Sequence, residues 1–573
     1  MILQPLVNIA EICSQKGVLE VVISPGSRSA VLTLAFARHP KIKTTVIPDE
    51  RVAGFVALGM AQQTNKTVAL VCTSGSAAYN LAPAIVEAFF QEIPLLVFTA
   101  DRPTEWAGQQ DGQTMYQTDL YGKHVKKSYQ LPSDYTNKDA VWAIERIVNE
   151  AINLTQIQNF GPVHINVPIR EPFYPTSEEK FEFDRNVRII ERIASQNTLS
   201  TETWHRLQAE WENADKILIA VGQNPPNEAL WKVLKQFSEE MGVVVLGDCT
   251  SNIPDDAAFV RNHDVIFGSK NEALFQDLQP DLLITIGNSF LSKNFKQFIR
   301  KNTPHRHWHL KETNEIIDSL QSMTCSIPVD STYFFSKLLE DLDYQQFVQN
   351  DDGNDERSEY KLRWETASND FKKRMNKFLN QEKRWNEFEI VRTILEQIPE
   401  NSILHLANSM PVRYVNLLGV PKGVEVRSNR GVSGIDGCTS SAVGAAMQTD
   451  KLVFLLTGDV AFFYDRNALW HSQVPDNLRI ILLNNGGGNI FRIIDGPSAQ
   501  PELEQYFETR HHTSAKRTCE DAGLTYQSIR PQEKINLDDF TKPSKSSQLL
   551  EIFTDPVLNG EVFEAYRTII SEK

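Results

Sequence analysis

Cysteine, long apolar runs and excess positive charge are all scarce in this chain. It has six cysteines, and no two of them form a Cys-x-x-Cys pair, so the sequence offers neither a zinc-ligand spacing nor a disulfide framework. No apolar run reaches the roughly 18 residues that a membrane span needs. The first residues also lack the basic, apolar and small-residue segments of a secretion signal. We therefore expect a cytoplasmic protein without a membrane span.

The charge balance and the missing glycine motifs argue against two further classes of protein. The formal net charge is −15 at pH 7, whereas general nucleic-acid binding requires a basic surface. No G-x-G-x-x-G follows a predicted strand and no G-x-x-x-x-G-K-[ST] occurs, which disfavours a dinucleotide- or ATP-binding protein. The histidines form no cluster typical of a metal site, and we predict no role for them.

Alternating strand-like and helix-like segments predict an α/β fold of three consecutive domains, each with a helix-flanked, mostly parallel sheet. We place the domains at residues 1–178, 195–345 and 376–573, because residues 176–200 and 347–375 are polar and are interpreted as connections. The predicted strands of the first two domains are 21–23, 44–47, 68–72, 95–99, 163–167, 216–221, 243–246 and 282–286.

Two apolar runs in the third domain end in polar turns. Residues 452–456 lead into Gly458-Asp459, and residues 478–483 lead into Asn484-Asn485. As neighbouring buried parallel strands with a helical crossover, they would place a carboxylate and a carboxamide at one sheet edge, where open α/β sheets bind ligands. Their donor atoms are oxygens, which suit Mg²⁺, an ion that usually shares its coordination shell with phosphate. The pair therefore predicts a metal-bridged diphosphate.

Other turns give weaker signals when taken singly. Glu50 follows the predicted strand at 44–47 and precedes a helix rich in small residues (52–61) that could pack closely against another helix or subunit. The alternative is that Glu50 only stabilises the helix dipole. The turns at 24–29 and 73–78 could hold an anion or merely cap a helix. The polar loop at 108–114 is of a kind that is more often functional than structural.

Four arginines fall at predicted strand ends or in loops, namely Arg28, Arg102, Arg413 and Arg430. The guanidinium fork binds both oxygens of a carboxylate. Each arginine alone could equally be a surface residue. Together they suggest a substrate with several negative charges.

On these residues the whole chain resembles the thiamine diphosphate (ThDP) enzymes. Asp459 and Asn485 resemble that family's metal and diphosphate motif, although the general motif reads Gly-Asp-Gly and Val460 stands at its third position here. A subfamily that tolerates a larger residue at this position joins 2-oxoglutarate to isochorismate in menaquinone biosynthesis. The chain is similar to it in five segments taken in order, which are 24–29, 49–51, 99–103, 428–431 and 485–491.

The resemblance implies a set of cofactor residues. Asp459, Asn485 and the carbonyl of Gly487 would bind Mg²⁺ or Mn²⁺. Glu50 would be catalytic, because its hydrogen bond to the aminopyrimidine ring promotes removal of the thiazolium proton. Ile435 would hold ThDP in its bent form. The full implied set of cofactor residues is Glu50, Ser409, Gly434, Ile435, Gly458, Asp459, Val460, Asn485, Gly487 and Ile490.

The resemblance also implies the reaction and the substrate residues. The enzyme would be a transferase that decarboxylates 2-oxoglutarate and adds the resulting carbanion to isochorismate. Both substrates carry two carboxylates, which accounts for the arginines. The implied substrate residues are Ser27, Arg28, Arg102, Gln113, Lys293, Arg413, Arg430, Ile490 and Phe491. The family usually has Asn before the loop glutamine, and Gly112 stands there in this chain.

In this family the first domain of one subunit faces the third domain of another. A homodimer would therefore be the minimum active unit, with a homotetramer as the alternative. Three other functions compete with this interpretation: another ThDP-dependent 2-oxo acid decarboxylase or carboligase, such as acetolactate synthase; a nucleotide-binding protein; and a relative without catalysis. The arginines argue against the first, the missing glycine motifs against the second, and Glu50 with Asp459 and Asn485 against the third.

Overall fold

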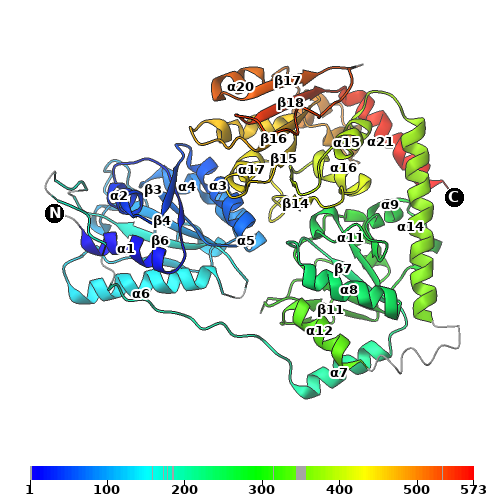
Figure 1. Cartoon of the computed structure of the whole chain (residues 1–573), viewed down its shortest axis with the longest axis horizontal. Coiled ribbons are helices and arrows are strands. Elements are labelled where there is room, and N and C mark those ends of the chain that lie inside the picture. The colour runs from blue at the N-terminus through cyan, green and yellow to red at the C-terminus, as the bar shows by residue number, and fades with distance from the viewer. Residues whose placement is uncertain are drawn as a thin grey trace.

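The computed structural model describes residues 3–157, 159–171, 173–176, 179–183, 186–313, 315–342, 356–531 and 533–572. Within these residues the chain forms three six-stranded sheets in which every strand pair is parallel. Figure 1 shows the three sheets as three helix-flanked groups, which follow one another along the chain. The predicted fold class is therefore confirmed.

The first unit contains the strands β1 (Glu20–Ile23), β2 (Lys43–Val46), β3 (Val68–Cys72), β4 (Leu95–Asp101), β5 (Ser128–Gln130) and β6 (Val163–Pro168). Its helices are α1 (Gln4–Gln15), α2 (Ala30–Arg38), α3 (Glu50–Thr64), α4 (Ser76–Asn80), α5 (Ala82–Gln91) and α6 (Lys138–Thr155). Each strand predicted here has a counterpart in the sheet. β3 and β4 are buried along their whole length, because helices cover both faces of a parallel sheet.

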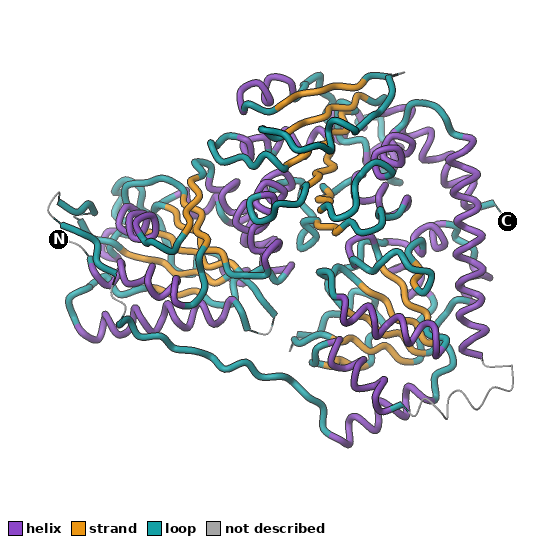
Figure 2. Tube along the Cα trace, in the orientation of Figure 1, coloured by secondary structure: helices purple, strands orange, loops and turns teal. Residues whose placement is uncertain are grey.

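The second unit contains β7 (Ile217–Val221), β8 (Val244–Gly247), β9 (Phe259–Val260), β10 (Leu282–Ile286), β11 (Arg306–Leu310) and β12 (Cys325–Ile327). Its helices are α7 (Thr201–Glu212), α8 (Glu228–Met241), α9 (His263–Gly268), α10 (Glu272–Asp277), α11 (Lys293–Lys301) and α12 (Ser331–Asp341). Between β6 and α7 the described residues form neither helix nor strand, as predicted for 176–200. Figure 2 shows this segment as a long loop from the first unit to the second.

The third unit contains β13 (Ile403–Leu406), β14 (Glu425–Arg427), β15 (Val453–Gly458), β16 (Leu478–Asn484), β17 (Thr525–Ile529) and β18 (Gln548–Phe553). Its helices are α15 (Glu387–Leu395), α16 (Met410–Leu418), α17 (Cys438–Ala446), α18 (Asp459–Tyr464), α19 (Ile490–Ile493), α20 (Lys516–Ala522) and α21 (Pro556–Ser571). The two strands predicted from residues 452–456 and 478–483 are β15 and β16, which pair directly. The predicted helical crossover between these two strands contains one short α-helix, α18.

The first and third sheets share one topology. Their strand orders are β2-β1-β3-β4-β6-β5 and β14-β13-β15-β16-β18-β17. In both sheets the first strand of the unit lies between the second and the third. The second strand is added on one side of it and the third on the other, which places topological switch points at β1/β3 and at β13/β15. Ligands of open α/β sheets bind at the carboxyl ends of strands at such points. The predicted site residues other than Lys293 follow these strands or their immediate neighbours.

Helices α3 and α17 occupy equivalent places in the two similar units and pack against each other. Their contact lacks room for side chains at two glycines. A Cβ atom built on Gly59 would lie 2.0 Å from the Ser441 carbonyl oxygen, and one built on Gly444 would lie 2.0 Å from the Val56 carbonyl oxygen. The small residues of 52–61 thus serve close helix packing, as predicted, and the partner in this structure is a helix of the same chain.

Helix α14 (Glu356–Gln381) joins the second and third units and differs from the sequence interpretation. Residues 347–375 were expected to form a polar connection, of which residues 347–355 lie outside the described residues. From Glu356 onward the chain is helical, and Tyr360, Trp364 and Phe378 are buried in one core that includes residues of both units. The apolar positions of this segment recur every three or four residues. This helical periodicity would have predicted the helix, whereas the polar overall composition suggested a connection. No helix in the described parts of the chain is both long and apolar enough to cross a membrane.

Candidate active site

The turns after β15 and β16 form a compact oxygen-rich site. The strands pair in parallel with Gly458 beside Leu483, so both chains leave the sheet at the same edge. The Asp459 carboxylate is buried. Its Oδ2 accepts hydrogen bonds from the amides of Gly486 at 2.7 Å and Gly487 at 3.0 Å, and its Oδ1 accepts from Val460 at 2.7 Å. These bonds fix the carboxylate against the glycine turn.

Asn485 presents an oxygen that has no partner. Its Nδ2 donates to Glu387 Oε1 at 2.9 Å, while its Oδ1 is buried and accepts no hydrogen bond from the residues that the structure describes. Buried polar atoms are rarely left unpaired, so an orphan of this kind requires an explanation. An amide oxygen beside a carboxylate is a donor set that a hard divalent cation prefers. The residues therefore fit the metal that the sequence predicts.

The glycine turn after Asn485 leaves no space for side chains. A Cβ atom on Gly487 would lie 2.6 Å from the Glu508 carbonyl oxygen, and the Gly488 amide donates to that oxygen at 2.7 Å. Gly486 has a φ of +78°, which glycine adopts readily. The Gly487 carbonyl, a predicted metal ligand, accepts a hydrogen bond from the Asn489 amide at 3.0 Å. The turn can thus bring backbone close to a bound anion.

His511 also lies at this edge, although no sequence pattern pointed to it. Its Nε2 is 3.4 Å from Asp459 Oδ2, and the Asp459 carboxylate raises the pKa of the imidazole. Its backbone amide donates to the Gly486 carbonyl at 2.9 Å. The contact comes from a loop far along the chain, so no local pattern could have found it.

The turns after β13 and β14 complete this half of the site. Asn408 Nδ2 donates to the carbonyls of Asn429 and Gly434 at 2.7 Å each, and Asn408 Oδ1 accepts from Arg430 Nη1 at 2.7 Å. Ser409 begins α16 with a φ of +77°, a conformation that costs energy for a residue with a side chain and is typical of functional turns. Ile435 packs against a small cluster of Ala407, Cys438 and Ala461.

Two arginines at this edge are held without a carboxylate partner. Arg413 donates to the Ser409 carbonyl at 2.5 Å, and burial followed by the nearby charge of Arg430 lowers its pKa. Burial lowers the pKa of Arg430, whose Nε is buried without a hydrogen-bond partner. Neither guanidinium forms an ion pair with a described residue. Like charges buried together favour an anion between them.

The first sheet positions a second group of predicted residues. Arg28 is 8% exposed and donates to the Ile169 carbonyl at 3.3 Å. Burial, and then the charge of Arg102, lowers its pKa. Arg102 forms an ion pair with Asp111 from the polar loop. Ser27 is exposed on the turn after β1. Gln113 lies beside Gly75, which belongs to the turn after β3: a Cβ atom built on Gly75 would be 3.4 Å from the Gln113 Cα atom.

Glu50 stands at the first turn of α3, where Asp49 performs the capping. The Asp49 side chain accepts from the amides of Arg51 at 3.0 Å and Val52 at 3.3 Å. The Glu50 carboxylate is half-buried and accepts from Asn80 Nδ2 at 3.4 Å. Glu50 is thus not the cap of α3, and its first-turn position also suits the alternative interpretation, in which its charge stabilises the helix dipole.

On the second unit, Lys293 begins α11 and is exposed. Lys296, one turn further along the same helix, is half-buried. Burial lowers its pKa, Asp248 raises it and the charge of Arg430 lowers it further. Lys296 is therefore close to Arg430 of the third unit, and the sequence analysis did not select it.

The two groups of residues remain separate in one chain. Among the described residues, no hydrogen bond or ion pair joins Ser27, Arg28, Glu50, Arg102 or Gln113 to the predicted residues of the third unit. The turn that contains Glu50 does contact that unit elsewhere, because Arg51 donates to the Tyr464 carbonyl at 2.8 Å and Asn467 donates to Asp49 at 2.8 Å.

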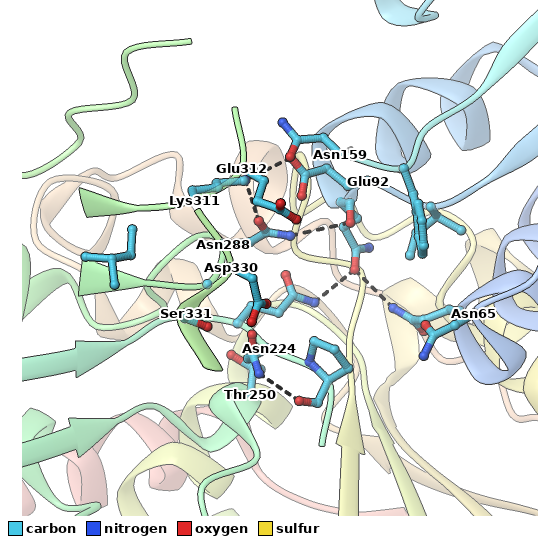
Figure 3. Close-up of a pocket in the computed structure, with 18 of the residues that line it drawn as sticks. Asn65, Glu92, Asn159, Asn224, Thr250, Asn288, Lys311, Glu312, Asp330 and Ser331 are labelled. Carbon is cyan, nitrogen blue, oxygen red and sulfur yellow. Dashed lines mark hydrogen bonds and ion pairs between the residues drawn. The ribbon is translucent and has the colours of Figure 1, made fainter. Parts of the chain in front are cut away.

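A separate cavity of about 490 Å³ lies where the three units meet. It opens at the carboxyl ends of β7 and β10, the switch point of the second sheet. Figure 3 shows Lys311 between Glu92 and Asn288, to which it is bonded at 2.9 Å and 2.6 Å. None of the predicted site residues lines this cavity. Its lining residues come from all three units.

Comparisons with known proteins agree with this geometry. Residues 8–122 match the family model for the thiamine pyrophosphate enzyme N-terminal TPP binding domain, and residues 186–406 match that for the middle domain of thiamine pyrophosphate enzymes. Together with the three parallel sheets, these matches define a thiamine diphosphate enzyme.

Full-length relatives narrow the class. The 2-succinyl-5-enolpyruvyl-6-hydroxy-3-cyclohexene-1-carboxylate synthases of Cytophaga hutchinsonii, Flavobacterium johnsoniae and Bacteroides thetaiotaomicron are 43%, 36% and 34% identical to this chain. The alignments cover 100%, 98% and 99% of this chain and 99%, 97% and 99% of the relatives. The chain belongs to the 2-succinyl-5-enolpyruvyl-6-hydroxy-3-cyclohexene-1-carboxylate synthase family.

Proposed function

We propose that this protein is a transferase of menaquinone biosynthesis that decarboxylates 2-oxoglutarate and joins the remaining four-carbon unit to isochorismate. The products are 2-succinyl-5-enolpyruvyl-6-hydroxy-3-cyclohexene-1-carboxylate and CO₂. Membership of the synthase family supports the reaction. The single structural observation that carries the substrate assignment is the pair Arg413 and Arg430, two guanidinium groups without ion-paired carboxylates at the edge that also holds Asp459.

The arginines account for the choice of substrate. Both proposed substrates are dicarboxylates, and a planar guanidinium binds a carboxylate through two parallel hydrogen bonds. A small neutral 2-oxo acid would leave most of these cations unpaired, at a cost that grows with their burial. In the proposed site Arg413 and Arg430 bind carboxylates from the third unit, while Arg28 and Arg102, with Ser27 and Gln113, bind from the first.

The residues of the third unit fit thiamine diphosphate and a divalent metal. Asp459 and Asn485 supply side-chain oxygens, Gly487 supplies a carbonyl, and Mg²⁺ or Mn²⁺ would link them to the diphosphate. Gly434, Gly458, Val460 and Ser409 contribute backbone at the same edge. When bound, ThDP supplies the electron sink that permits a 2-oxo acid to lose CO₂.

The other residues orient groups or move a proton. Glu50 holds a proton shared with the ring nitrogen of the aminopyrimidine, a task that suits a half-buried carboxylate. Ile435 supports the cofactor from its small apolar cluster. Ile490 and Phe491 form an apolar wall that excludes water from the reacting carbon, and Phe491 is supported by Phe507, whose ring centroid is 5.8 Å away.

We further propose that residues 1–178, 195–345 and 376–573 are the pyrimidine, central and diphosphate domains, since each contains one of the sheets. Residues 178 and 345 lie outside the described part of the chain. A homodimer with Glu50 and Asp459 from different subunits, alone or paired into a homotetramer, would join the two groups of residues. All six cysteines are free thiols, which suits a reducing cytoplasm.

The test is an assay with purified full-length protein, ThDP, Mg²⁺ and 2-oxoglutarate, with and without isochorismate. We expect isochorismate consumption that requires both ThDP and 2-oxoglutarate, with the product confirmed by mass. CO₂ release without isochorismate consumption would instead indicate another ThDP-dependent decarboxylase. Absence of both reactions, with ThDP bound, would reject 2-oxoglutarate as the donor.

A further inference from the structure

Glu387 is a buried carboxylate that the proposed mechanism does not use. It is the first residue of α15 and is 1% exposed. Asn386 caps this helix by accepting from the Glu389 amide, so Glu387 is not needed as the cap. Since burying an ionisable group is costly unless it is bonded, its partners indicate its role.

The Glu387 carboxylate accepts hydrogen bonds from neighbouring side chains. Its Oε1 accepts from Asn485 Nδ2 at 2.9 Å and from Thr554 Oγ1 at 3.0 Å, and the Tyr414 hydroxyl also donates to it. Thr554 Oγ1 accepts from Asn559 Nδ2 at 3.1 Å, which leaves its own proton for Glu387. Burial raises the pKa of Glu387 and the charge of Asp459 raises it further, while the bonds from Asn485, Thr554 and Tyr414 act in the opposite direction. Oε1 meets both Asn485 and Thr554 as a hydrogen-bond acceptor.

Because Oε1 already accepts from the Thr554 hydroxyl, the end of the Asn485 amide that faces it must be a donor, and this determines how Asn485 is turned. The amide nitrogen of Asn485 must face Glu387, and its oxygen must face the opposite way. That oxygen is the buried atom without a partner. A rotation of the amide by 180° would place oxygen against oxygen and is disfavoured.

We propose that Glu387 is a positioning residue that fixes the carboxamide of Asn485, so that Oδ1 is preset as a ligand for the divalent cation that holds the diphosphate. The inference rests on the proposed function only through the metal and cofactor, and not through the substrates. Partners of this kind orient metal ligands in many sites, and their loss typically weakens metal binding by about 10- to 100-fold.

A double-mutant cycle tests the orientation. Glu387→Gln, Asn485→Asp, the double variant and the wild type are titrated with Mg²⁺ by calorimetry at saturating ThDP, without substrates. In the wild-type background Glu387→Gln should weaken Mg²⁺ binding by about 10- to 100-fold, because Gln can offer either end to the amide. In the Asn485→Asp background the same change should cause no loss or a gain, because the Gln amide can donate to the new carboxylate.

The cycle separates positioning from simple loss of charge. Removing a negative charge weakens cation binding in both backgrounds, so this effect cancels in the comparison. Equal losses in both backgrounds would overturn the proposal, whether they arise from charge or from a damaged fold. Unchanged binding by Glu387→Gln would overturn it as well.

Two controls complete the experiment. Glu389→Gln, on the same helix and ion-paired to Arg392 at 2.6 Å, should bind Mg²⁺ like the wild type. Thermal unfolding of each variant without metal or cofactor reports any damage to the fold separately. If the wild-type chain binds no Mg²⁺ in the presence of ThDP, the proposed function and this inference both fail. If the wild type binds Mg²⁺ and the cycle shows equal losses, only this inference fails.

Discussion

Gly59 lies against the backbone of Ser441, with its missing Cβ only 2.0 Å from the Ser441 carbonyl oxygen. The two residues belong to α3, which begins at Glu50, and to α17, which precedes β15 and Asp459, so these two helices touch backbone to backbone. The contact sets the distance between the first and third units. It is therefore sensitive to the addition of a single carbon atom.

Gly59→Ala should separate these helices and lower the thermal unfolding midpoint by several degrees. Extra methyl groups in a packed interface cost about 1–3 kcal/mol, and here the obstacle is backbone that cannot rotate away. Gly112→Ala is the matched control, because nothing lies within 4 Å of its Cβ position. Differential scanning calorimetry of both variants would test this, and equal midpoints would contradict the packing described above.

Glu50→Gln should retain ThDP and Mg²⁺ binding while it loses nearly all turnover. The neutral amide has almost the same shape, but it cannot hold the proton that Glu50 is proposed to share with the cofactor ring. Calorimetry measures the binding and the isochorismate assay measures the rate. Activity close to that of the wild type would remove Glu50 from its proposed role.

Asp459→Ala should abolish metal-dependent ThDP affinity, because it removes both a proposed ligand and the acceptor of the Gly486 and Gly487 amides. Mixing this variant with Glu50→Gln tests the proposed dimer. If the two residues serve one cofactor from different subunits, mixed dimers contain one intact site and recover part of the activity. If they serve it from one chain, both inactive variants stay inactive in the mixture.

Asp465 should make stability depend on pH. Burial raises its pKa from 3.8 to about 7, while hydrogen bonds from Ser440 act in the opposite direction. The folded state therefore binds the proton more tightly than the unfolded state, so the free energy of unfolding falls as the pH rises from about 4 to about 7. Asp465→Asn should flatten this part of the pH profile in thermal unfolding, and an unchanged slope would contradict the assignment.

Lys296→Gln should raise the KM for a dicarboxylate substrate by about tenfold, the effect of losing one charge-assisted hydrogen bond of about 1.4 kcal/mol. We expect this effect because Lys296 lies near Arg430, one of the proposed carboxylate-binding residues. Lys293→Gln provides the comparison, since Lys293 is exposed at the helix start. Steady-state kinetics with each substrate varied in turn would separate the two lysines. A larger effect at Lys293 would favour the residue selected from sequence.

Sequence patterns predicted most of the buried strands but not β11, β13 or β18, and among the edge strands of the three sheets they predicted β2 alone. The apolar runs of β3, β10 and β16 are continuous because helices cover both faces. By contrast β17, with only Ile529 buried, has no such run. The polar composition of α14 concealed its stripe of Tyr360, Trp364 and Phe378, because composition averages over faces that periodicity would separate.

The residues of the candidate site also differ in whether the sequence could predict them. Asp459 and Asn485 were predictable because each directly follows a buried strand. Glu387 and His511 were not, because they reach these residues from segments distant in sequence, and only tertiary structure brings them there. Glu50, Ser27 and Gln113 were located by resemblance, and their roles remain predictions.

The segment 169–200 has a consequence for assembly. Its described part contains no helix or strand, and hydrogen bonds such as that from the Ile190 amide to Asn149 hold one end of it to the first unit. A covalent connection of this length keeps the first unit at a local concentration on the order of millimolar near the rest of its chain. A single proteolytic cut there would leave every sheet intact and turn the α3–α17 contact into a bimolecular equilibrium that dilution can dissociate.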